Sequence, residues 1–418
     1  MKSEKEAQLP QNLVIANATL PGRAGRWCLA IEDTRIAALA EGDSARSAFG
    51  DRAAGEAWDV EGRLVSPGLV DAHVHVDKAL TDDRVGDVLA SEGLAAAIRA
   101  VRGLKAGFSV ADVRERATRA LGMSVAAGTV HARTYCEADP FVELRAVDAL
   151  IQIERDLAPV IGVQSIAFPQ EGWFRTEGTM EAGSAPWIER AIERGMRIVG
   201  GNVNGALWPS SPEAQIDAMF ALAGRHDCDL DMHIDNWDGP QSFALPYLAA
   251  KTIELGWQGR VGASHIVSLA HVSGAEAANA IDLVKRAGVH VCVLPTRIKL
   301  TCVAELLEAG VNLACGSDNM RDPFVRFGDA DPMKALLLLA QITGMLGNAD
   351  LERLWFTVTA NAARMMRLPR YGLDPGCDAD LVVFDAHSVP ETILHQAARL
   401  LVLKQGRRVA GTFETPPE

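Results

Sequence analysis

The sequence predicts a (β/α)8 barrel accompanied by a small β-sandwich that both ends of the chain build. Short apolar, β-rich runs alternate with longer segments of helical period between residues 65 and 320, and eight such runs are found. Further strand-like pieces stand at both ends of the 418-residue chain. This alternation is typical of parallel strands joined by helices, and eight such units close into a barrel.

The eight runs follow one another with helical segments between them. They lie at residues 64–75, 129–135, 160–168, 197–203, 230–235, 260–266, 290–295 and 312–318. Residues 110–128 and 273–288 are examples of the segments between, and their apolar residues recur with the spacing of an amphipathic helix. A doubly wound open sheet is the alternative fold. It is less favoured because no glycine-rich phosphate-binding fingerprint follows the first run.

Alternating strand-like pieces at the two ends predict a second, smaller unit. They occupy residues 12–64 and 377–413, with turn residues between them. Neither end alone has enough strands for a domain, so we expect the two ends to form one sandwich together. The predicted domains are a sandwich from residues 1–64 and 370–418 and a barrel from residues 65–369.

Composition and charge exclude several classes of partner. The net charge is −13, and no lysine or arginine stripe is present, which argues against nucleic acid and anionic membranes and favours a small-molecule substrate. Seven scattered cysteines without a CxxC pair indicate reduced thiols. No apolar run of about 18 residues and no apolar signal-peptide core are seen, so we expect a cytoplasmic protein.

Unusual polar residues stand at the carboxyl ends of the predicted strands, where barrel enzymes carry their active sites. His73 and His75 end the first strand, His233 the fifth, His265 the sixth and Asp318 the eighth. Alternate residues on a strand face one side, so the two imidazoles of the HxH pair point into one space and favour a divalent metal. Such a site lowers the pKa of a bound water to about 7. The alternative is that these are hydrogen-bonded histidines of half-buried strands.

Six motifs occur in an order that resembles the amidohydrolase superfamily and, within it, the cytosine deaminase-like branch. They are SPGLVDAHVHVDK, GTVHARTY, IAFPQEG, MHID, ASHI and GSDNMRDPF. The resemblance covers nearly the whole chain, including the strand-like pieces at both ends. HxHxDK and SDN look more like the isopropylammelide amidohydrolase side of the branch, whose enzymes hydrolyse an alkylamine from an s-triazine ring.

The resemblance implies a single divalent metal, zinc or iron, and a set of residues around it. The implied ligands are His73, His75, His233 and Asp318. His265 is expected to polarise the bound hydroxide or the substrate, and Asp318 to pass a proton from the water to the departing nitrogen. Gln170 is expected to bind the substrate, since its amide offers both donors and an acceptor. The expected reaction is hydrolysis of a C–N bond in a small cyclic or amide substrate by metal-activated hydroxide.

Three residues separate this chain from an ordinary cytosine deaminase. Asn236 stands where those enzymes carry a proton-shuttling Glu, and Asn319 replaces a second Asp; an amide cannot exchange a proton near neutral pH. Lys78 is expected to hold a substrate oxygen or to supply a proton, unless it is a solvated loop lysine. We expect Asn236, Asn319 and Asp235 to contact the substrate.

Tryptophans follow three of the strand-end motifs and are candidates for the wall of a substrate pocket. They are Trp173, Trp208 and Trp237, and we expect Trp237 to bind the substrate. Two other functions stay open: a cytosine-like deaminase with another proton relay, and a non-catalytic binding protein on the same scaffold. Homo-oligomers are common in the superfamily that the chain resembles, and the sequence sets no symmetry.

Overall fold

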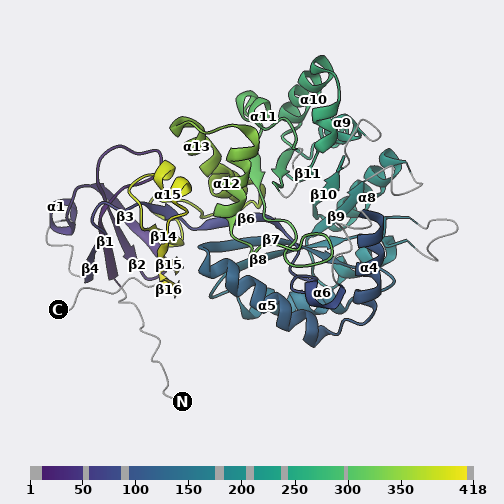
Figure 1. Cartoon of the computed structure of the whole chain (residues 1–418), viewed down its shortest axis with the longest axis horizontal. Coiled ribbons are helices and arrows are strands. Elements are labelled where there is room, and N and C mark those ends of the chain that lie inside the picture. The colour runs from purple at the N-terminus through teal and green to yellow at the C-terminus, as the bar shows by residue number, and fades with distance from the viewer. Residues whose placement is uncertain are drawn as a thin grey trace.

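A computed structural model describes residues 12–49, 56–85, 94–174, 183–203, 211–236, 243–295 and 300–411. Figure 1 shows two bodies side by side: a barrel surrounded by helices, and a smaller body in which purple strands from the start of the chain lie beside yellow strands from its end. The described ranges contain one eight-stranded sheet and two four-stranded sheets. The predicted fold class is confirmed.

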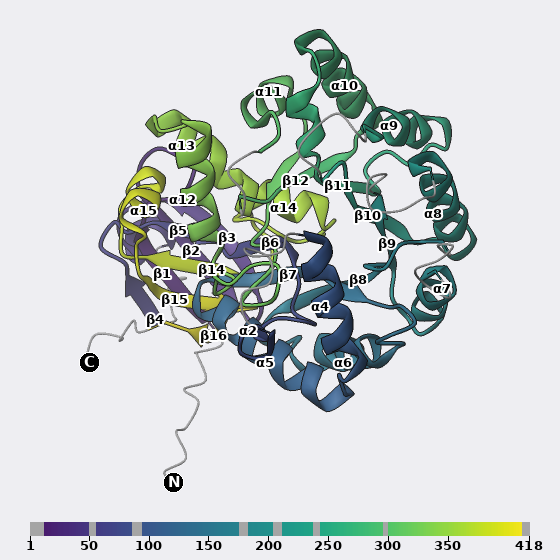
Figure 2. The same cartoon turned by 45° about the vertical axis from the view of Figure 1, so that its right-hand side comes forward.

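The eight-stranded sheet forms the barrel. Its order follows the chain from β6 to β13, and neighbouring strands are parallel. The strands are β6 (Leu69–Val74), β7 (Thr129–Glu137), β8 (Gly162–Phe168), β9 (Ile198–Val203), β10 (Asp229–Ile234), β11 (Val261–His265), β12 (His290–Val293) and β13 (Leu313–Cys315). Figure 2 shows the helices ranged around them.

The barrel closes between its first and last strands, next to predicted metal ligands. The amide of Asp318 donates to the carbonyl of His73 at 2.8 Å, and the amide of His75 donates to the carbonyl of Asp318 at 3.2 Å. A Cβ on Gly316 would lie 2.6 Å from the Cβ of His73, which is closer than two carbons can approach. The glycine therefore allows β13 to meet β6.

The helices outside the barrel present apolar faces to it. In α6, for example, Val147, Leu150 and Ile153 are buried at helical spacing. Ser109, Ser211 and Ser273 cap the starts of three helices by accepting a backbone N–H. The helices are α2 (Asp82–Val85), α4 (Leu94–Ala106), α5 (Val110–Ala126), α6 (Arg145–Asp156), α7 (Ala185–Glu193), α8 (Pro212–His226), α9 (Leu245–Glu254), α10 (Gly274–Ala287), α11 (Val303–Ala309), α12 (Pro332–Thr343), α13 (Asn348–Trp355) and α14 (Ala360–Met365).

Both ends of the chain contribute to the two smaller sheets. One has the order β3-β2-β1-β4 and the other β16-β15-β14-β5. They share one apolar core, to which Leu13, Leu29, Leu381 and Leu403 belong. The elements are β1 (Asn12–Ala18), β2 (Trp27–Glu32), β3 (Arg35–Glu41), α1 (Ala45–Phe49), β4 (Glu56–Asp59), β5 (Val65–Pro67), β14 (Leu381–Phe384), α15 (Val389–His395), β15 (Arg399–Lys404) and β16 (Arg407–Ala410).

The run at residues 64–75 was expected to be one strand, and this expectation is wrong. It forms two strands, because β5 pairs with β14 of the terminal sheet while β6 opens the barrel. Pro67 has no N–H to continue a ladder, and Gly68 follows it at the break. The limits of the two domains stay a prediction. Of the helices in the described ranges, none has the length and apolar character needed to cross a bilayer.

Candidate active site

The four predicted metal ligands come together at the carboxyl end of the barrel strands. His73 lies on β6 and His233 on β10, while His75 and Asp318 follow β6 and β13. One donor atom of each lies within 4.8 Å of the donor atoms of the other three, and all four residues are buried. Barrel closure thus assembles one site from residues that are far apart in the chain.

The spacing of three donor pairs is close to that expected around one divalent ion. His75 Nε2 lies 3.2 Å from His233 Nε2. Asp318 Oδ1 lies 3.5 Å from His75 Nε2 and 3.6 Å from His73 Nε2. Donors that surround zinc at 2.0–2.1 Å in a tetrahedron are separated by about 3.3–3.4 Å. Nε2 of His73 makes no hydrogen bond to a described residue, so this nitrogen is available to an ion.

The charge states of His75, His233 and Asp318 also suit a cation. Burial lowers the pKa of both His75 and His233 well below the ordinary value for histidine. Burial alone would raise the pKa of Asp318, but His73 and the other imidazoles of the site hold that pKa below its ordinary value. Neutral imidazoles and an ionised carboxylate are the forms that bind a divalent metal.

Three strand ends at the site have backbone conformations that side chains rarely adopt. Asp235, His265 and Asp318 have φ angles of 51°, 74° and 63°, in the left-handed region. Such strain persists where surrounding contacts hold it, and it clusters at functional sites. The ring centroid of His265 lies 4.8 Å from that of His233 and 5.5 Å from that of His73. His265 is therefore next to the ligand set, as the sequence predicts.

The carboxylate of Asp235 accepts hydrogen bonds from backbone amides. Its two oxygens accept hydrogen bonds from the amides of Ala244 and Leu245 at the start of α9, each at 2.9 Å. The amide of Ser268 donates to the backbone carbonyl of Asp235. These bonds hold the turn that follows His233. A contact of Asp235 with the substrate stays a prediction.

Lys78 is buried beside the site in a charged group that we call the lysine network. Its members are Lys78, Lys105, Glu137, Asp139 and Glu171, each at most 2% exposed. Lys78 Nζ donates to Glu137 Oε1 at 2.9 Å and lies 2.9 Å from His75 Nδ1. Lys105 Nζ lies 2.5 Å from Asp139, 2.6 Å from Glu137 and 2.8 Å from Glu171. The interpretation of Lys78 as a solvated loop lysine is therefore wrong.

Two aromatic rings lie close to the Lys78 ammonium. Its Nζ lies 5.8 Å from the ring centroid of Phe168 and 5.9 Å from that of Phe324. Burial alone would lower the pKa of Lys78, but Asp77 and Glu137 raise it, so the ammonium keeps its charge. A catalytic or substrate-holding role for Lys78 stays a prediction.

The predicted substrate-binding amides differ in their surroundings. Gln170 follows β8 and is 8% exposed. Asn319 donates from Nδ2 to Asp322 at 2.6 Å. Asn236 Oδ1 is buried and has no hydrogen-bond partner in the described ranges. Asn236 therefore offers an acceptor to an N–H group; substrate contact by the three amides stays a prediction.

The three tryptophans give no information about the substrate pocket. Trp208 and Trp237 lie outside the described residues. Trp173 is 3% exposed and belongs to the apolar core around the barrel. The assignment of Trp237 to substrate binding is thus untested.

Four buried residues of the barrel interior form a hydrogen-bonded chain that ends on His73. We call it the inner relay; its members are Arg133, Asp231, Tyr135 and Ser264. Arg133 Nη1 donates to Asp231 Oδ2 at 2.8 Å, and Tyr135 Oη donates to Asp231 Oδ1 at 2.7 Å. Ser264 Oγ lies 3.1 Å from Tyr135 Oη and 2.9 Å from His73 Nδ1.

Sequence reasoning missed the inner relay and most of the lysine network. A usable signal is the alternation of Arg133, Tyr135 and Glu137 along β7, which repeats the two-residue spacing of the HxH pair. Phe324 was also missed: it ends the motif GSDNMRDPF, but the motif alone does not distinguish it from a packing residue. Alternation indicates which residues face inward, but it does not name their partners.

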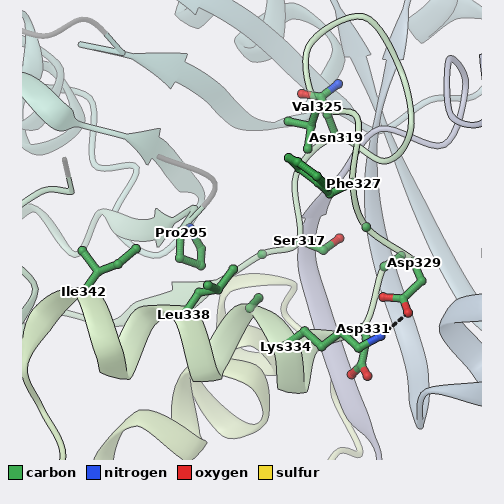
Figure 3. A pocket seen from close by; sticks show the side chains of 14 residues that line it. Pro295, Ser317, Asn319, Val325, Phe327, Asp329, Asp331, Lys334, Leu338 and Ile342 are labelled. Carbon is green, nitrogen blue, oxygen red and sulfur yellow. Dashed lines mark hydrogen bonds and ion pairs between the residues drawn. The ribbon is translucent and has the colours of Figure 1, made fainter. Parts of the chain in front are cut away.

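A pocket of about 400 Å³ lies beside the strand end that carries Asp318. Figure 3 shows it between α12, with Leu338 and Ile342, and the segment that carries Val325 and Phe327. Ser317 and Asn319, the two neighbours of Asp318, line it, whereas the four metal ligands do not. The pocket is therefore next to the candidate metal centre without including it.

Comparisons with known proteins agree with this geometry. The sequence model described as the amidohydrolase family matches residues 153–410. The N-isopropylammelide isopropyl amidohydrolase of Pseudomonas sp. (strain ADP) is 34% identical over 357 residues, which are 84% of this chain and 86% of that protein.

Solved structures extend the likeness to the whole fold. The 5-methylcytosine deaminase of Klebsiella pneumoniae, liganded with 5-fluorocytosine, has a TM-score of 0.87 at 28% identity, covering 97% of this chain and 99% of that chain. The N-isopropylammelide isopropylaminohydrolase of Burkholderia multivorans has a TM-score of 0.83 at 26% identity, covering 96% and 98%. The barrel and the terminal sheets are thus shared together.

Proposed function

The chain belongs to the amidohydrolase family, and we propose that it hydrolyses the exocyclic C–N bond of a small N-substituted amino-heterocycle and releases an amine. It is an enzyme that acts on C–N bonds other than peptide bonds. The observation that carries the proposal is the convergence of four buried donors from His73, His75, His233 and Asp318.

These donors would hold one divalent ion, zinc or iron. Three imidazole nitrogens and a carboxylate suit either metal. When bound, the ion would supply a polarised water as the nucleophile. The fit rests on the separations of 3.2–3.6 Å in three donor pairs and on His73 Nε2, which has no hydrogen bond in the described part of the chain.

Residues around the ligands would move the proton and hold the substrate. Asp318 and His265 would take the proton of the attacking water and return it to the departing nitrogen. Asn236 cannot pass a proton, but its buried Oδ1 would accept an N–H of the substrate. Gln170 would bind the ring edge, with donor and acceptor atoms side by side.

A flat, nitrogen-rich ring suits this end of the barrel. The rings of Phe168 and Phe324 both lie close to Lys78 Nζ, and aromatic faces pack well against planar rings. The Lys78 ammonium would hold a ring oxygen. Two relatives have names that refer to N-isopropylammelide and 5-methylcytosine, and we extend this type of substrate to the present chain. All seven cysteines are free thiols, which supports a cytoplasmic location.

A product-resolved screen tests the proposal. The enzyme is stripped with a chelator, reconstituted with Zn²⁺ or Fe²⁺, and incubated with N-alkylamino-triazines, aminopyrimidines, cyclic ureas and N-acyl compounds. We expect turnover only after reconstitution, with an alkylamine as the product. Ammonia from aminopyrimidines would favour instead a deaminase, the second candidate that the fold likeness to 5-methylcytosine deaminase supports.

Variants of the proposed metal ligands test whether turnover in this screen depends on the site. His73→Ala and Asp318→Ala should reduce turnover to background, because each removes a donor from the set. The matched control is His226→Ala, since His226 lies at the end of α8 outside this set. Full activity in either ligand variant, or the same loss in the control, would contradict the proposal.

A further inference from the structure

The chemistry of the inner relay's members decides which atom donates and which accepts in each of its hydrogen bonds. Asp231 is ion-paired with Arg133, so its carboxylate accepts and does not donate. Tyr135 has one proton and gives it to Asp231. Its oxygen must therefore accept in the contact with Ser264, 3.1 Å away.

The same reasoning gives the direction of the hydrogen bond between Ser264 and His73. The single proton of Ser264 is used toward Tyr135, so Ser264 Oγ must accept in its contact with His73 Nδ1 at 2.9 Å. Nδ1 of His73 then carries the proton of the neutral ring, and Nε2 carries the lone pair. The same geometry places Nε2 among the other donor atoms of the site, 3.6 Å from Asp318 Oδ1, where it makes no hydrogen bond in the described ranges.

We propose that Asp231, Tyr135 and Ser264 are positioning residues that hold His73 as its Nδ1–H tautomer and thereby present Nε2 to the divalent ion. The metal part of this statement rests on the proposed function. Partners of this kind orient ligating imidazoles and raise their basicity. The tautomer part is a property of the chain without an ion.

Packing and anchoring make the relay rigid. Arg133 also donates from Nε and Nη2 to Gln164 Oε1, at 3.1 and 2.8 Å, and Gln164 donates to the carbonyl of Met366 at 2.9 Å. The ring of Tyr135 lies against that of His73, with centroids 4.2 Å apart. The hydroxyl of Tyr135 can thus be removed while its ring continues to support His73.

Tyr135→Phe breaks the relay with the smallest change of shape. Without the acceptor at Tyr135, the Ser264 hydroxyl is free to turn and donate to His73 Nδ1, which moves the ring proton to Nε2. We expect the affinity for Zn²⁺, measured by competition with a chelator, to fall about 10- to 100-fold. Ser264→Ala is the second variant and should weaken Zn²⁺ binding in the same range.

Tyr371→Phe is the matched control. Tyr371 donates its hydroxyl proton to the carbonyl of Gly68 at 2.7 Å, away from the ligand set, so its loss should leave the Zn²⁺ affinity unchanged. Thermal unfolding of the metal-free proteins checks that the two tyrosine variants are equally well folded. Equal Zn²⁺ affinities in Tyr135→Phe and Tyr371→Phe would overturn the proposal.

NMR of the metal-free enzyme reads the tautomer directly. With ring-labelled histidine, and His73 assigned through His73→Gln, we expect the Nδ1–H form in the natural chain and an increased Nε2–H form in Tyr135→Phe. An Nε2–H form in the natural chain would overturn the proposal. If the natural chain binds no ion, the metal-centre proposal fails, and the tautomer still decides whether the relay acts on His73.

Discussion

The inner relay and the lysine network each contact one histidine of the HxH pair, and they do so with different chemistry. His73 Nδ1 meets the hydroxyl of Ser264, whereas His75 Nδ1 meets the ammonium of Lys78. The relay passes through two hydroxyls before it reaches its one ion pair, Asp231 with Arg133. The network places ammonium groups directly among buried carboxylates.

This difference shows that buried polar groups can serve a site in two ways. A hydroxyl donates or accepts, so a chain of hydroxyls can set the tautomer of an imidazole without adding charge. An ammonium only donates, and a buried one needs carboxylate partners, so the lysine network places fixed charge beside the candidate metal site. We therefore expect a broken relay to change metal affinity, and a broken network to change stability or turnover.

The largest expected effect is the loss of Lys105, the centre of the lysine network. Lys105→Met removes the ammonium that Glu137, Asp139 and Glu171 share. Glu137 keeps Lys78 and Glu171 keeps Arg102, whereas Asp139 is left buried without a cation in the described ranges. Removing one partner of a buried ion pair typically costs about 3–5 kcal/mol. Urea unfolding should show a fall of this size in the free energy of unfolding. Lys285→Met, which removes an exposed ammonium on α10, is the control and should leave the unfolding midpoint in place.

Lys78→Met should act on turnover more than on folding. Glu137 keeps its contact with Lys105, so no carboxylate of the network loses its last cation. We expect kcat/KM to fall about 10- to 100-fold with the metal content unchanged, because the proposed function gives Lys78 a ring oxygen of the substrate to hold and no place among the metal ligands. Steady-state kinetics and metal analysis of the same preparation measure both quantities. A lower metal content with an unchanged kcat per bound ion would contradict this assignment. Lys78 would then act, like the relay, by positioning a histidine for metal binding.

The smallest effect concerns His290, near the base of the inner relay. Burial and the charge of Arg133 lower the pKa of His290 to about 4 from an ordinary value of 6.5. The unfolded chain takes up a proton as the pH falls through 6.5, while the folded chain does so only near pH 4, so stability is lost within this window. The linkage relation gives about 2 kcal/mol between pH 7 and pH 5.

His290→Gln removes this titration and should flatten the dependence of stability on pH. The variant also disturbs the contact of His290 Nδ1 with Asn312, which adds a constant loss at both pH values. Urea unfolding at pH 7 and pH 5 therefore compares differences within each protein. An equal fall in stability in both proteins would show that another group carries the acid sensitivity.

Much of the fold was predictable because its signals are local. Alternating apolar runs and amphipathic segments indicated the barrel, and strand-like pieces at both ends indicated the sandwich. The split at Pro67 was missed, since one apolar run of residues 64–75 serves two different sheets. The ligand set was predictable because histidine and aspartate at strand ends are rare and chemically distinct.

Residues such as Tyr135, Ser264 and Lys105 were not predictable as parts of the site. The alternation along a strand identifies the side that a residue faces, and it is encoded locally in the chain. Its partners depend on strand register, which places Ser264 opposite His233 on β10 and Gln164 opposite Arg133 on β7. The amino-acid sequence was therefore sufficient for the fold class and for the candidate metal ligands that the barrel brings together, because periodicity and ligand chemistry are local. The contacts that support each histidine exist only once the barrel closes, because they join side chains from different strands.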